Sequence, residues 1–118
     1  MLTLHGQKGC TFGTMKWNEY TDQNRRAWDE IAEVRHARWP SPDFFGDGGS
    51  LLDDRITDIV GNVHGSSVCH LQCATGEDSL SWANLGAKVT GIDISAIQIK
   101  LAVKKAHDAS IPALVATK

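Results

Sequence analysis

Apolar residues in the first half of the chain recur at the spacing of an α-helix. The recurrence predicts one helix that begins at Thr21 or Asp22 and ends near Arg38, and a second from Ser50 to about Gly61. The residues expected to form the buried faces are Trp28, Ile31, Ala32 and Arg35 in the first helix, and Leu52, Ile56, Ile59, Val60 and Val63 in or just after the second.

Prolines and glycines mark the boundaries of this helical region. Pro40 and Pro42 cannot continue the first helix, and the Pro-, Asp- and Gly-rich residues 41–49 predict a loop. Residues 1–14 show no clear period and contain three glycines, so we expect a flexible or non-native extension there. Residues 15–64 then form the N-terminal helical region.

From residue 65 onward, short apolar runs alternate with helical segments. The runs predict strands over 67–71, 88–92 and 113–116. Helices are expected between them, over 78–85 and from Ser95 to Ala109. Ser95 and Gln98 have the spacing of a capping box, in which each side chain bonds the other residue's backbone N–H. Strands that alternate with helices of this length pair in parallel, so the sequence predicts an α/β fold.

Composition and charge exclude several classes of protein. The chain is 42% hydrophobic and 22% charged, as is ordinary for a globular domain, and its net charge of -2 gives no sign of a nucleic-acid partner. No apolar run approaches the ~18 residues of a membrane helix, so no membrane association is expected. Three cysteines, Cys10, Cys69 and Cys73, form no disulfide framework and indicate a cytoplasmic location.

The turn after the first predicted strand carries the most chemical information. The small residues between Gln72 and Gly76 lead into a helix whose first N–H groups are unpaired and can face a ligand. Asp93 ends the second strand, where a carboxylate can accept hydrogen bonds from a ribose diol. The turn positions Gln72, Ala74 and Gly76 alternate, unlike the G-x-G-x-x-G fingerprint of dinucleotide-binding proteins.

Two stretches resemble the class I (Rossmann-like) S-adenosylmethionine (SAM) dependent methyltransferases. Residues 68–76, VCHLQCATG, resemble that family's V-L-D-L-G-C-G-T-G, and residues 86–95, GAKVTGIDIS, resemble its G-x-x-V-x-G-x-D-x-S. The resemblance implies a three-layer Rossmann-like parallel sheet with strands in spatial order 3-2-1. It also implies that residues 15–64 form a lid, and that 65–118 are the first half of the SAM-binding domain, truncated after the third strand. Such an N-terminal fragment is expected to be inactive alone and to associate through its exposed first strand.

The resemblance also implies roles for individual residues. The turn from Gln72 to Gly76 wraps the methionine part of SAM, Asp93 holds the ribose hydroxyls, Ile94 lies against adenine, and Gln98 borders the pocket. The full set of expected cofactor-binding residues is His70, Leu71, Gln72, Cys73, Ala74, Gly76, Asp93, Ile94 and Gln98. No catalytic residue is assigned and no metal is expected. The implied partner is a small-molecule methyl acceptor, and the oligomeric state is left open.

Three residues depart from the family pattern. His70 stands where the family usually has an acidic residue, and Gln72 and Ala74 replace glycines. Ala74 is a mild change only if its φ is negative. For His70, a structural hydrogen bond and a place in the pocket are equally open, and Asp93 has a helix cap as its alternative role. The alternatives for the whole chain are a non-catalytic nucleotide-binding or protein-interaction module, and an NAD-dependent oxidoreductase.

Overall fold

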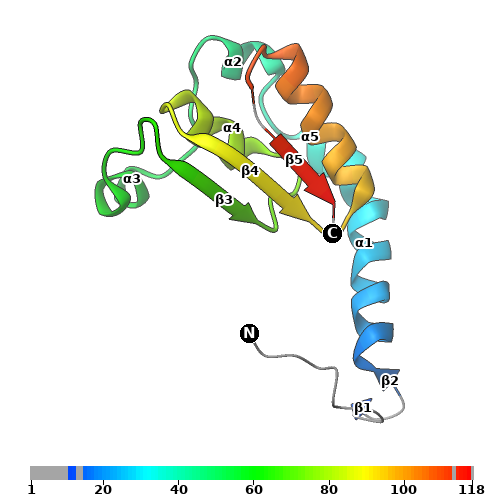
Figure 1. The fold of residues 1–118 in the computed structure, drawn as a ribbon. Coiled ribbons are helices and arrows are strands. Elements are labelled where there is room, and N and C mark those ends of the chain that lie inside the picture. The colour runs from blue at the N-terminus through cyan, green and yellow to red at the C-terminus, as the bar shows by residue number, and fades with distance from the viewer. Residues whose placement is uncertain (1–10, 13–14, 113, 118) are drawn as a thin grey trace.

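A three-stranded parallel sheet forms the centre of the molecule (Figure 1). The computed structural model describes residues 11–12, 15–112 and 114–117, with side chains over 16–112. The sheet order is β3-β4-β5, so the predicted spatial order is confirmed. The elements of this unit are β3 (Ser67–Leu71), α4 (Glu77–Asn84), β4 (Lys88–Asp93), α5 (Ala96–Asp108) and β5 (Leu114–Thr117).

The N-terminal region is helical, as predicted, but its boundaries differ. The elements are β1 (Thr11–Phe12), β2 (Met15–Lys16), α1 (Trp17–Ala37), α2 (Pro42–Gly46) and α3 (Asp54–Val60). Helix α1 begins before Thr21 because the Glu19 carboxylate accepts the Lys16 backbone N–H at 2.9 Å and caps the first turn. Pro42 begins α2 inside the expected loop, since its fixed φ suits a first helical position. The extension predicted for residues 1–14 lies largely outside the described residues.

The predicted buried faces of both N-terminal helices are largely wrong. In α1 only Ala32 is buried, whereas Trp28 and Ile31 are each more than 40% exposed. In α3 no residue is buried, and Ile59 is 86% exposed. Only Val63, which follows that helix, reaches the core. Helical spacing identified residues that share a face, but the described elements cover only part of that face in α1 and leave that of α3 exposed.

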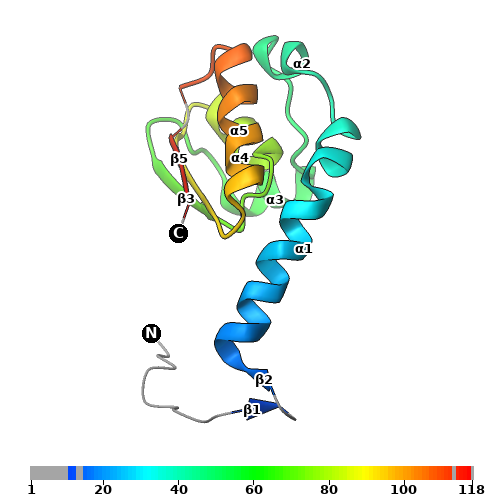
Figure 2. The same cartoon turned by 90° about the vertical axis from the view of Figure 1, so that its right-hand side faces the viewer.

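In the part of the chain that the structure describes, helices cover one face of the sheet and leave the other open (Figure 2). Helices α1, α4 and α5 lie on the same side, because two right-handed crossovers that step in one direction place their helices on one face. Val89 and Gly91 point toward the helices and are buried, whereas Cys69 and Leu71 lie on the opposite face and are exposed. The described residues therefore form two layers rather than the predicted three.

The core lies between the sheet and the helices. One cluster joins α2, α4 and α5 through Phe45, Leu80, Ala106 and Ala109. The N-terminal half of α1 extends beyond the sheet, while its C-terminal half packs against α5 (Figures 1 and 2). None of the helices in the described ranges is both long and apolar enough to cross a membrane.

Candidate functional site

The turn after β3 and the end of β4 meet at the carboxyl edge of the sheet. Parallel register sets Leu71 beside Ile92, so the residues that follow each strand are neighbours. The Cys73 N–H donates to the Ile92 carbonyl at 3.0 Å, and the Ala74 N–H donates to Asp93 Oδ2 at 2.9 Å. The structure thus brings the predicted turn and the predicted carboxylate into direct contact.

Asp93 links this turn to the start of α5. Its second carboxylate oxygen, Oδ1, accepts the Ser95 N–H at 2.8 Å, and the residue is 9% exposed. Each carboxylate oxygen keeps the capacity to accept a further hydrogen bond. Ser95 caps α5 as predicted, with its Oγ accepting the Gln98 N–H at 3.1 Å. The reciprocal half of the capping box is wrong, because the Ser95 N–H is already bonded to Asp93.

The turn has a left-handed backbone at three alternate positions. The φ angles are 56° at Gln72, 51° at Ala74 and 86° at Gly76. Ala74 is therefore not the mild change that a negative φ would make it. Left-handed backbone costs a residue with a side chain roughly 1–2 kcal/mol relative to ordinary conformations. All three alternate positions of the turn therefore have a backbone conformation that favours glycine, although two of them hold other residues.

His70 makes a structural hydrogen bond. Its Nδ1 lies 2.8 Å from Oγ of Ser79, a fully buried residue of α4. The contact fixes α4 against β3. Of the two alternatives that the sequence leaves open for His70, this geometry favours the structural one.

The two described cysteines differ in exposure. Cys73 is 2% exposed, and burial, reinforced by the negative charge of Asp93, raises the pKa of its thiol to about 11. Cys69 is exposed on the open face of the sheet. In the part of the chain that the structure describes, no group of His, Cys, Asp and Glu side chains is arranged to hold a metal ion.

Helix α1 covers the start of α5. Ser95 Oγ donates to Asp29 Oδ1 at 2.5 Å, and Gln98 Nε2 donates to the Trp28 carbonyl at 3.4 Å. Gln98 is 1% exposed, and its Oε1 is buried without a partner. The structure therefore encloses Gln98 under α1 instead of leaving it open at the border of a pocket. The other predicted site residues differ in exposure, with Leu71 67% exposed and Ile94 half-buried.

Sequence reasoning missed a buried ion pair beneath the turn. Lys105 Nζ lies 2.6 Å from Glu77 Oε1 and 3.1 Å from the Thr75 carbonyl oxygen. The two charged side chains are 1% and 6% exposed. Helical spacing carried a signal, because Lys105 lies three residues after buried Ala102 on the inner face of α5.

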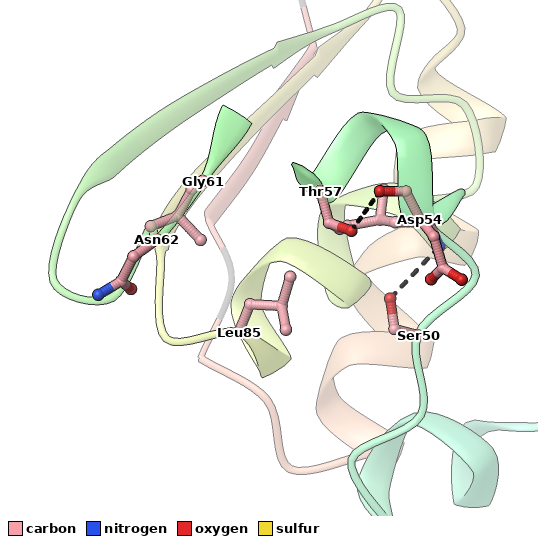
Figure 3. Close-up of a pocket in the computed structure, with 8 residues that line it drawn as sticks. Ser50, Asp54, Thr57, Gly61, Asn62 and Leu85 are labelled. Atoms are coloured by element: carbon pink, nitrogen blue, oxygen red, sulfur yellow. Dashed lines mark hydrogen bonds between the residues drawn. The ribbon is translucent and has the colours of Figure 1, made fainter. Parts of the chain in front are cut away.

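A pocket of about 380 Å³ lies at the opposite end of the sheet (Figure 3). It is lined by Ser50, Leu52, Asp54, Thr57, Gly61, Asn62, Val63 and Leu85. Val63 precedes β3 and Leu85 precedes β4, so the pocket faces the amino ends of the strands. Its hydroxyl groups bond nearby backbone: Thr57 Oγ1 donates to the Asp54 carbonyl at 3.0 Å. None of the predicted site residues lines this pocket.

Comparison with known proteins finds similarity among solved structures only. No family model and no curated protein matches the chain. A structure from the conversion of a disulfide bond into a thioacetal group during echinomycin biosynthesis is 31% identical, over 75% of this chain and 39% of that chain, with a TM-score of 0.51. The 4+2 cyclase SpnF is 20% identical, over 83% of this chain and 41% of that chain, with a TM-score of 0.56. A TehB-like SAM-dependent methyltransferase from Corynebacterium glutamicum is 18% identical, over 86% of this chain and 46% of that chain, with a TM-score of 0.46.

These neighbours agree with the resemblance in residues 68–95 as far as the fold is concerned, and one of the three is named a SAM-dependent methyltransferase. The chain spans less than half the length of each of these neighbours. One of them is named for a cyclisation, and a shared fold does not by itself fix an activity.

Proposed function

We propose that this chain is the cofactor-binding portion of a SAM-dependent methyltransferase, with the site at the turn of residues 72–76 and at Asp93. The observation that carries the proposal is the backbone of the turn. Gln72, Ala74 and Gly76 have positive φ at alternate positions, at the carboxyl end of β3 and in contact with Asp93. Ligands of open α/β sheets bind at this edge.

The residues present fit a ligand with a ribose and a charged amino-acid end. Asp93 retains acceptor capacity for ribose hydroxyls, although both of its oxygens already accept backbone N–H groups. The N-terminus of α4, which follows the N-cap residue Gly76, favours a carboxylate. The exposed Gln72 amide can bond the same end of the ligand, and Ile94 offers an apolar surface to adenine.

Bound SAM supplies an electrophilic methyl group for direct displacement by a nucleophilic acceptor. The share of this chain is to bind and orient the cofactor, since alignment of the reacting groups removes much of the barrier. We infer that the acceptor is a small molecule. No side chain of the site is assigned as an acid or a base.

Methyl transfer also needs a surface for the acceptor, which we place outside this unit. Parallel sheets are normally covered on both faces, yet among the described residues nothing covers the face that holds Leu71 and Cys69 or pairs with the outer edge of β3. This open surface supports the inference that a further part of the enzyme packs on the sheet and completes it.

The test is a thermal-shift comparison of SAM with NAD on this chain. A ligand that binds only the folded state at about 100 times its Kd stabilises it by about 2.7 kcal/mol. We expect SAM, but not NAD, to raise the melting temperature. An Asp54→Ala control, at the pocket of Figure 3, should keep the response. Stabilisation by NAD alone would contradict the proposal.

A further inference from the structure

The ion pair beneath the turn has no part in the binding roles given above. Lys105, on α5, places Nζ 2.6 Å from Oε1 of Glu77, the first residue of α4. Both side chains are almost completely buried. Such a pair is weak evidence for stability, because the cost of removing two charges from water offsets much of their attraction. Its position suggests a role in shaping the turn.

The contacts of the pair converge on one residue of the turn. Lys105 Nζ donates a second hydrogen bond, of 3.1 Å, to the carbonyl oxygen of Thr75. The Thr75 hydroxyl donates to the same Glu77 Oε1 that receives the lysine. Thr75 is fully buried and lies between Ala74 and Gly76, two residues with positive φ. Main chain and side chain of Thr75 are therefore both fixed.

The conformation of the turn needs such a restraint. Gln72 and Ala74 hold a left-handed backbone that residues with side chains rarely adopt, and such conformations persist only where the surrounding structure holds them. Asp93 restrains the Ala74 N–H from β4. Lys105, which lies on α5, restrains the following residue of the turn, Thr75, from the helical side of the sheet.

We propose that Lys105 and Glu77 are positioning residues that hold the turn of residues 72–76 in its left-handed conformation for cofactor binding. The identity of the cofactor rests on the proposed function. Neither side chain contacts the ligand, and both act through Thr75. An ammonium group has three donors, so lysine can bond a carboxylate and a carbonyl together.

The test removes both charges together. In the Lys105→Met, Glu77→Leu double variant, apolar side chains of similar size replace the pair, which proteins often tolerate. We expect a cooperative melt but SAM affinity about tenfold weaker by calorimetry, the loss for one charge-assisted hydrogen bond. The matched control is Lys104→Met, Asp108→Leu, which removes an exposed pair of the same 2.6 Å length within α5, the helix that also holds Lys105. The control should bind like the parent.

A second readout needs no ligand. Amide hydrogen exchange at Ala74 reports whether the turn is held, and we expect faster exchange in the Lys105→Met, Glu77→Leu variant than in the control. Parent-like exchange with parent-like affinity in the folded variant would overturn the inference. If the parent chain binds no SAM, the proposed cofactor is wrong, and exchange at Ala74 still decides the restraint. If the double variant does not fold, Glu77→Gln takes its place, and parent-like exchange and affinity there also count against the inference.

Discussion

Replacement of Ala74 by glycine should stabilise this chain, although alanine is usually the more stabilising residue. The φ of Ala74 is 51°, a left-handed value that costs alanine roughly 1–2 kcal/mol and glycine almost nothing. Glycine loses more backbone entropy on folding, which offsets about 0.4–1 kcal/mol of this gain. The net expectation for Ala74→Gly is an increase of about 1 kcal/mol in the free energy of unfolding. For a domain of this size that raises the melting temperature by about 4 °C.

The assay is urea and thermal unfolding followed by circular dichroism. The matched control is Ala27→Gly, at an exposed position inside α1, where glycine should lower the free energy of unfolding by about 1 kcal/mol. The two substitutions are chemically identical, and only the backbone conformation differs. If Ala74→Gly destabilised the chain as much as the control does, the left-handed turn would be refuted.

Four further predictions concern single side chains. Asp93→Ala should weaken SAM binding by about 1.5–3 kcal/mol in calorimetry, and unchanged affinity would exclude a ribose contact. In thiol labelling read by mass spectrometry, exposed Cys69 should react in the native state and Cys73 only after unfolding, because burial raises the pKa of its thiol to about 11. Burial, and to a lesser extent the positive charge of Lys105, lowers the pKa of His36 below 6.5. The free energy of unfolding should therefore be highest above about pH 6.5, where the His36 ring is neutral, and should fall as pH drops toward the folded pKa, because the folded state disfavours the protonated ring. In urea unfolding, His36→Asn should lack this fall in the free energy of unfolding. Leu71→Lys, on the open face, should reduce self-association in sedimentation, and unchanged association would place the contact elsewhere.

The elements after residue 65 could be predicted because their signals are local. Strand and helix periods alternate cleanly there, and Ser95 marks the start of α5 as expected. Helix α1 began early because one glutamate, Glu19, reaches back to the Lys16 N–H, a contact that the apolar period does not report. The failed prediction for α3 has another cause. Period gives the face that apolar residues share, whereas burial depends on what packs against it, and Ile59 is left exposed.

The candidate site was predictable in position but not in its internal contacts. The turn and Asp93 meet because parallel strands bring their carboxyl ends together. The positive φ of Ala74 could not be predicted, because the residue is not a glycine and its conformation is held by tertiary contacts. Lys105 and Glu77 are 28 residues apart, and nothing in the local pattern pairs them. Contacts between residues so far apart in the sequence become visible only in the folded structure.

The most direct test of the central claim is a nuclear magnetic resonance titration of the 118-residue chain with SAM. The backbone amides of residues 72–76 and 93–95 should shift together as SAM is added, because the turn and Asp93 form one site. The amides around Asp54 and Asn62, at the pocket of Figure 3, should stay unchanged. Shifts confined to that pocket, or no shifts at saturating SAM, would contradict the account.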